Sequence, residues 1–231
     1  MKKTKTQKRK GFTLVELLVV IAIIAVLAGI GTPLILRARK AGDRTEAANN
    51  AKALAGGLNS FRQEKGSYPC QSTRELLEDD GVDNLPEGTD ANAYLAQLVV
   101  TDIIDSEQYF FAPGVRGTAK GDDIKKPGEL LKRGENGFAY IMTEDELPLG
   151  GDISITPIVI APLKKSGENP TFDASPYDGK FVYGAIDGSS KTGEISDKGV
   201  AKSKGRESLF EQGRDSLFGS DIPVIKAPTG L

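Results

Sequence analysis

A run of twenty uncharged residues from Leu17 to Leu36 constrains this chain more than any other feature. A helix rises about 1.5 Å per residue, so this run would reach about 30 Å, the thickness of the hydrocarbon core of a bilayer. Six lysines and arginines precede it between Met1 and Lys10, and positively charged flanks stay in the cytoplasm. We therefore expect one membrane-spanning helix over residues 12–36, with its N-terminus inside and the rest of the chain outside.

Glu16 is the only charged residue between Gly11 and Leu36, and it stands at the head of the apolar run. A carboxylate in hydrocarbon costs on the order of 2.5–3.5 kcal/mol at the helix centre, so such a residue is a candidate functional site by default. Near the end of a helix the side chain could instead extend to the lipid headgroups. We expect Glu16 to act either as a docking charge or as a snorkelling residue.

Two ordinary interpretations of this segment compete with a functional one. A secretory signal peptide would have the same basic and apolar regions, with Val26-Leu27-Ala28 as its cleavage site. A signal anchor that is never cut would keep the helix in the membrane. Glu16 argues against the signal peptide, because it would lie inside the apolar region of that signal.

A third interpretation comes from residues Lys10 to Leu18, which read Lys-Gly-Phe-Thr-Leu-Val-Glu-Leu-Leu. They resemble the class III leader of type IV pilins and type II secretion pseudopilins. The resemblance implies that prepilin peptidase removes residues 1–11 by cutting between Gly11 and Phe12, and that it then methylates the Phe12 amine. It also implies that Glu16 pairs with this amine on a neighbouring subunit and sets the register between the two.

Pro33 occupies a position at which many type IV pilins also carry proline. Proline deletes one backbone donor and crowds the preceding turn, and Gly29, Gly31 and Gly42 lower helix propensity nearby. We expect a kink at Pro33 or a local loss of helix over residues 29–42.

Helical periodicity continues over residues 37–66, but there only one narrow face stays apolar. Gly66-Ser67-Tyr68-Pro69 ends the helix, because glycine suits a left-handed cap and proline cannot continue it. A similar Gly-x-Tyr-Pro follows the long helix of major pseudopilins. One long helix is therefore predicted from about Phe12 to Lys65, and its second half should pack on the chain's own globular domain. The apolar face consists of Ala47, Ala51, Leu54, Leu58 and Phe61.

Residues 67–231 should form that globular domain, with strands concentrated in its C-terminal half. Alternating apolar and polar residues predict strands over 153–163 and 180–186, and Asp187-Gly188 predicts a tight turn into a third strand over 191–195. The expected fold class is α+β and pilin-like: a long kinked N-terminal helix packed on a small antiparallel sheet. The other expected elements are short helices over 72–78 and 92–98, a long irregular and mobile connection over 112–136, and a short helix or loosely attached segment over 197–231.

Composition argues against several functions. Beyond residue 11 the chain has 24 basic and 32 acidic side chains, and an acidic body disfavours nucleic acid as a partner. The chain has no histidine, which removes the commonest general base and the commonest metal ligand. The sequence contains no nucleophile paired with a base and no phosphate-binding glycine loop, so we do not expect an enzyme.

Asp187, Glu194 and Asp197, together with Ser189, form an oxygen-rich stretch. Major pseudopilins are similar in often carrying a calcium-binding loop near the C-terminus. Calcium takes six to eight oxygen ligands, and the alternative is ordinary turn chemistry with solvated charges. No other metal or cofactor is expected. Cys70 is the only cysteine, so an intrachain disulfide is excluded, and we expect a part-buried residue rather than a reactive thiol.

The resemblance implies a structural subunit with a single span in the bacterial inner membrane and a periplasmic or extracellular domain over residues 67–231. Its implied partners are prepilin peptidase, sister subunits, and an assembly ATPase with its platform protein. These would add it to a periplasmic pseudopilus or a cell-surface filament. The alternative function is a membrane-anchored extracytoplasmic binding module, such as a substrate receptor, that joins no filament.

Overall fold

A computed structural model describes residues 12–126, 128–143, 154–167, 169–202, 207–211, 216–218 and 222–230. The chain divides into two compact units, of which the first ends at Arg39 and the second begins at Lys40. Because this boundary falls inside the long helix α1, each unit contains part of that helix.

Helix α1 spans Leu14–Lys65, so the prediction of one long N-terminal helix is confirmed. Arg62 and Lys65 lie in its last turn, where positive side chains interact favourably with the helix dipole. Gly66 follows with a φ of 82°, the left-handed conformation that glycine adopts without steric cost, and its N–H donates to the Arg62 carbonyl. Among the described residues, α1 is the only helix long and apolar enough to cross a membrane.

The second unit contains a six-stranded antiparallel sheet in the order β7-β6-β5-β2-β1-β8. The Asp187-Gly188 turn joins β5 to β6 as predicted, with the Ala185 N–H donating to the Ser189 carbonyl. A separate two-stranded ribbon pairs β3 with β4. The strands are β1 (Ala139–Met142), β2 (Pro157–Ala161), β3 (Leu163–Lys165), β4 (Thr171–Phe172), β5 (Lys180–Ala185), β6 (Ser190–Ile195), β7 (Ala201–Lys202) and β8 (Val224–Lys226).

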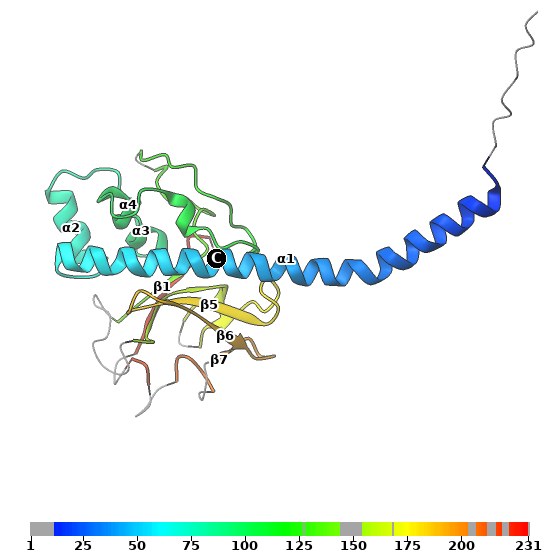
Figure 1. Cartoon of the computed structure of the whole chain (residues 1–231). Coiled ribbons are helices and arrows are strands. Elements are labelled where there is room, and N and C mark those ends of the chain that lie inside the picture. The colour runs from blue at the N-terminus through cyan, green and yellow to red at the C-terminus, as the bar shows by residue number, and fades with distance from the viewer. Residues whose placement is uncertain are drawn as a thin grey trace, which may run out of the picture. The chain divides into compact units, whose positions relative to one another are not determined.

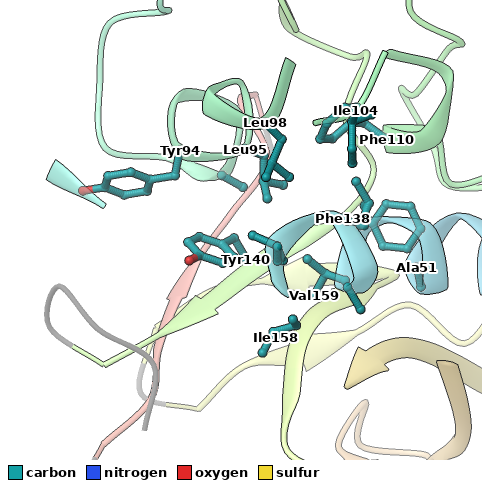
Figure 2. Packing of buried hydrophobic residues seen from close by; sticks show 14 of the residues in the cluster. Ala51, Tyr94, Leu95, Leu98, Ile104, Phe110, Phe138, Tyr140, Ile158 and Val159 are labelled. Atoms are coloured by element: carbon teal, nitrogen blue, oxygen red, sulfur yellow. The ribbon is translucent and has the colours of Figure 1, made fainter. Parts of the chain in front are cut away.

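Short helices form the other layer of this unit, and the C-terminal half of α1 lies between them and the sheet (Figure 1). Figure 2 shows the α1 helix that carries Ala51 passing between Leu95 and Leu98 of the short helices and Ile158 and Val159 of β2. The predicted apolar face of α1 is buried in this core, so its packing role is confirmed. The helices are α2 (Gln71–Asp79), α3 (Ala91–Leu95), α4 (Gln97–Val100) and the single 3₁₀ turn η1 (Glu107–Phe110).

Helix α1 and strand β5 approach closely at Gly184. A Cβ at this position would lie 2.9 Å from both the Ala55 Cβ and the Val159 Cγ2, and it would also crowd the Ala51 carbonyl oxygen. Contacts this short do not occur between real Cβ atoms and their neighbours, so the sheet can reach the helix only with glycine here.

The opposite face of the sheet is also buried, which the sequence did not indicate. Phe181 and Tyr183 of β5 pack on this face, and their rings are 5.8 Å apart. Leu217 and Phe218, from the C-terminal segment, cover them and are each at most 1% exposed. The prediction of a loosely attached segment or short helix over 197–231 is therefore wrong for its described residues, which supply two strands and part of a second core.

Two smaller predictions also need correction, and one strand of the sheet had no prediction. The helix expected over 92–98 is divided at Ala96 into α3 and α4. The strand expected over 153–163 is divided into β2 and β3, and its first residue, Ile153, lies outside the described residues. Strand β1 was not predicted, because four consecutive buried residues show no alternation.

Candidate functional site

Glu16 lies in the first turn of α1, where it closes a hydrogen-bonded cap with Thr13. One Glu16 carboxylate oxygen accepts the Thr13 backbone N–H at 2.8 Å and the Thr13 hydroxyl at 2.7 Å. The Glu16 N–H donates in return to the Thr13 Oγ1 at 3.3 Å. This is a capping box, in which a threonine and a glutamate three residues later satisfy each other's backbone donors.

Thr13 is thus a residue of the site to which the sequence analysis gave no role. The signal was present, because Thr-x-x-Glu before an apolar run is the sequence signature of a capping box. The cap holds the carboxylate at the start of the helix, next to Phe12, whose side chain is 77% exposed. Gly11, the other half of the predicted cleavage site, and the leader over residues 1–11 lie outside the described residues.

The apolar side chains in the first half of α1 are not covered by any other part of the chain that the structure describes. The large apolar residues from Leu14 to Leu36 are between 45% and 80% exposed. Such a surface is stable only against lipid or against another apolar protein surface. It is the largest unpartnered apolar surface among the described residues.

Pro33 lies within this half of α1, and the helix continues through it and through residues 29–42. The Thr32 hydroxyl donates to the Ala28 carbonyl at 2.8 Å, one turn earlier. The local loss of helix that the sequence allowed over 29–42 is therefore absent here, while a kink at Pro33 stays a prediction.

The structure does not bring together the three carboxylates predicted as calcium ligands. Asp187 precedes β6 and Asp197 follows it, and six extended residues span about 20 Å. Asp187 accepts the Ser189 N–H at 2.8 Å and lies 3.6 Å from the Lys191 ammonium, which is turn chemistry of the expected alternative kind. Exposed Glu194 lies within the strand. These three carboxylates do not converge in the described part of the chain, and a calcium site there stays a prediction.

Another group of carboxylates does converge: oxygens of Glu107, Asp122 and Glu135 lie within 4.8 Å of one another. No other such group exists within the part of the chain that the structure describes. Glu107 is fully buried, and it accepts the Leu131 N–H at 2.6 Å and the Asp123 N–H at 2.9 Å. The residues come from η1 and the irregular connection, and nothing in their spacing of 15 and 13 marks them in the sequence.

Lys132 supplies the positive charge that this group needs. Its ammonium lies 2.6 Å from an Asp122 oxygen, 3.0 Å from Glu129 and 3.7 Å from Glu135. Burial raises the pKa of Glu107 and of Glu135, while the hydrogen bond from Lys132 lowers the pKa of Asp122. The Lys132 ammonium lies where a bound cation would have to lie, and each Glu107 oxygen already accepts a backbone N–H. We therefore interpret the group as a structural one that fixes the connection over 112–136.

That connection was predicted to be a mobile surface, and the contacts of Glu107 instead attach it to η1. Glu107 and Asp123 bond to each other twice: the Asp123 N–H donates to the Glu107 carboxylate, and the Asp123 carboxylate accepts the Glu107 N–H at 2.6 Å. Asn92 of α3 adds a second attachment by donating to the Leu131 carbonyl at 2.6 Å.

Cys70 is buried rather than part-buried, with 2% of its surface exposed. It is the N-cap of α2, and its N–H donates to the Thr73 hydroxyl oxygen at 2.9 Å. The Thr73 hydroxyl also lies 2.7 Å from the Gln97 side chain, so Cys70 stands beside a satisfied polar network.

Comparison with known proteins places the chain in a family. The model of the prokaryotic N-terminal methylation motif matches residues 6–32. The type II secretion system core protein G of Klebsiella pneumoniae is 30% identical over 117 residues, which cover 48% of this chain and 80% of the relative. The corresponding protein of Escherichia coli K12 is 28% identical over 144 residues, or 62% of this chain and 91% of the relative.

The type IV major pilin protein PilA of Myxococcus xanthus is 41% identical over 61 residues, which are 26% of this chain and 28% of the relative. No solved structure gives a significant match. The family is structural rather than enzymatic, in agreement with the expectation from the sequence. The methylation motif, the long apolar helix packed on an antiparallel sheet, and the similarity to core protein G together establish that this chain belongs to the type IV pilin and pseudopilin family.

Proposed function

We propose that this chain is a structural subunit of a type II secretion pseudopilus or of a related type IV pilus-like filament. The observation that carries the proposal is the exposed apolar half of α1, from Leu14 to Leu36. Before assembly this surface would lie in the lipid of the membrane, and in a filament it would lie against the same surface of sister subunits. Both environments remove it from water without any change in the globular unit.

Processing would precede assembly. Prepilin peptidase would cut between Gly11 and Phe12 and methylate the new Phe12 amine, leaving a positive charge four residues from Glu16. In a medium with few other partners, a Glu16 carboxylate and the Phe12 amine of a neighbouring subunit would attract each other strongly. The similarity to core protein G favours the secretion system over a surface pilus.

The chain would cross the bacterial inner membrane once, with its N-terminus inside and its globular unit in the periplasm. An assembly ATPase with its platform protein would then move it from the membrane into the filament. These partners follow from membership in the family.

Crosslinking in membranes tests the function against the alternative of a monomeric anchored binding module. With a cysteine introduced at Val19 or at Ile23, a filament subunit should form disulfide-linked homo-oligomers through α1 and appear in the sheared filament fraction. The same cysteine at exposed Thr192 of β6 is the matched control. A full-length protein that stays monomeric at every α1 position would refute the proposal.

The intact mass of the mature protein tests the processing step separately. Loss of residues 1–11 with the gain of one methyl group is expected. Loss of residues 1–28 would instead identify Val26-Leu27-Ala28 as a signal peptidase site, and an uncut chain would identify a plain signal anchor.

A further inference from the structure

The outer face of α2 carries an exposed apolar residue surrounded by carboxylates. Leu76 is 59% exposed, whereas its neighbour Leu77 is 4% exposed and packs into the core. Glu75 and Asp79 flank Leu76 on the same helix, and all three residues are exposed. We call this surface, with the carboxylates that follow it, the α2 face. Its members are Glu75, Leu76, Asp79, Asp80, Asp83 and Glu87, all of them exposed.

The charges of the α2 face are unfavourable for α2 itself. Glu78, Asp79 and Asp80 stand at its C-terminal end, where the helix dipole disfavours negative charge, and its last turn has no basic residue. Arg74 is the only cation between Cys70 and Ala91, and it pairs with Glu78 at 2.8 Å. The other carboxylates take part in none of the ion pairs found among the described residues.

Helix α1 shows the opposite pattern just after its apolar run. Arg37, Arg39, Lys40 and Arg44 lie within eight residues, and none of them enters an ion pair in the described part of the chain. Lys40 and Arg44 are four residues apart, a spacing at which like charges destabilise a helix. We call these four residues the basic segment.

The basic segment also opposes the charge rule for membrane proteins. Positive residues concentrate on the cytoplasmic flank of a span, yet this segment lies on the outer flank. Once residues 1–11 are removed, only the Phe12 amine remains on the inner flank. Two surfaces of opposite charge therefore remain without an ion-pair partner among the residues that the structure describes.

We propose that the α2 face docks on the basic segment of a second copy of this chain. The inference rests on the proposed function, and it names one contact between neighbouring subunits. Leu76 would meet only the last residues of the apolar half, Leu34, Ile35 and Leu36, which are 54–71% exposed, and the rest of that half would lie against the helices of sister subunits. An apolar centre with charges around it is the usual anatomy of a protein interface.

Lys40 and Arg44, the two residues of the basic segment that belong to the second unit, lie far from α2 along helix α1. Arg44 and Lys65 are separated by 21 residues of α1, or about 32 Å along the helix axis. Helix α2 lies beside the C-terminal end of α1, as Figure 1 shows. The partner must therefore be a copy displaced along the helix axis by roughly this distance, which is the relation between stacked subunits of a filament.

Disulfide crosslinking between two full-length copies tests the contact directly. One copy carries Ser72→Cys on α2 and the other carries Ala38→Cys between Arg37 and Arg39 of the basic segment, so all charges are kept. The native Cys70 is buried, and the protein without added cysteines controls for it. Heterodimers should form with this pair at a level at least ten times that of the matched control pair, Ala38→Cys with Thr192→Cys.

Charge reversal tests the electrostatic part. Asp79→Lys with Asp80→Lys in one copy should lower crosslinking about tenfold, and so should Lys40→Glu with Arg44→Glu in the other. Combining the two reversed copies should restore it. The lysines at the end of α2 should leave the melting temperature unchanged or raise it, because they suit the helix dipole. A damaged fold would lower it instead.

The outcomes separate this inference from the proposed function. Two results would overturn the docking contact and leave the proposed function standing. In the first, filaments form but the Ser72 and Ala38 cysteines do not crosslink. In the second, combining the two charge-reversed copies does not restore the crosslink. Crosslinked oligomers without filaments would support the contact and refute the filament. A third outcome would assign the basic segment to lipid headgroups. In that case the Ser72 and Ala38 pair crosslinks no more than the control pair, and Lys40→Glu with Arg44→Glu abolishes binding to anionic vesicles. The docking contact would then be wrong.

Discussion

The Thr13 hydroxyl donates a 2.7 Å hydrogen bond to the Glu16 carboxylate, and the two residues together cap helix α1. The carboxylate that is proposed to dock a sister subunit is therefore also a helix cap in the single chain. These two roles need different chemistry. A cap needs a hydrogen-bond acceptor at residue 16, whereas docking to a positive amine needs a negative charge.

Substitutions at residue 16 separate the two roles. Glu16→Gln keeps the cap, because glutamine also serves in a capping box, but it removes the charge. We expect Glu16→Gln and Glu16→Ala to insert normally and to abolish filament assembly alike, as measured by membrane fractionation and by the yield of sheared filaments. The matched variant Thr13→Val removes the hydroxyl and keeps the charge, and it should still assemble. Normal assembly of Glu16→Gln would show that residue 16 acts as a cap only.

Gly184→Ala should destabilise the globular unit. The added Cβ would contact Ala55 and Val159 at 2.9 Å, so β5 would have to move away from α1. Overpacking of this kind costs about 1–3 kcal/mol of unfolding free energy. Urea denaturation of the full-length protein in detergent measures the loss.

The control for this substitution is Gly56→Ala in α1. A Cβ at Gly56 meets nothing within 4 Å, so alanine should raise stability by about 0.5–1 kcal/mol through helix propensity. Equal effects of the two substitutions would mean that the approach of β5 to α1 is not close at Gly184.

The buried carboxylate of Glu107 should make stability fall as the pH rises. Burial raises its pKa above the ordinary value of 4.5, so the folded state holds this proton at pH values where the unfolded state has lost it. The contribution is complete below about 4.5 and is lost as the pH rises through the folded-state pKa. Asp122 has the opposite dependence, because Lys132 lowers its pKa and its contribution is lost in acid.

Glu107→Gln removes the first of these titrations. The difference in melting temperature, variant minus unchanged protein, should increase as the pH rises from 4 to 7. Exposed Glu87→Gln is the control and should follow the unchanged protein throughout. A melting-temperature difference that stays constant with pH would contradict the assignment of a raised pKa to Glu107.

Phe218→Ala should be among the most destabilising single substitutions in the C-terminal segment. Phe218 is 1% exposed and its ring lies 5.8 Å from that of Phe210, nearly parallel to it. Removing a buried aromatic side chain costs about 3–5 kcal/mol. Thermal unfolding measures the effect, and Ile222→Ala, at a residue 69% exposed, should change stability by less than about 0.5 kcal/mol. A small effect of Phe218→Ala would show that the segment does not contribute to the core.

The sequence by itself determined the long N-terminal helix of this protein and its end at Gly66. The apolar run, the leader motif, the narrow apolar face of α1 and the cap at Gly66 are all local patterns, and each depends only on residues close together in the chain. For the same reason the β5 to β6 turn at Asp187-Gly188 was predictable, because a tight turn depends on its own two residues.

Only the tertiary structure decided the rest. Burial of Phe181 on a second core face, the attachment of the C-terminal segment through Phe218, and the convergence of Glu107 with Asp122 and Glu135 all join residues far apart in the sequence. The local sequence pattern does not predict such contacts, because each depends on how distant parts of the chain pack together rather than on local propensity. The structure does not bring the predicted calcium ligands together, because Asp187 and Asp197 lie on either side of the extended strand β6.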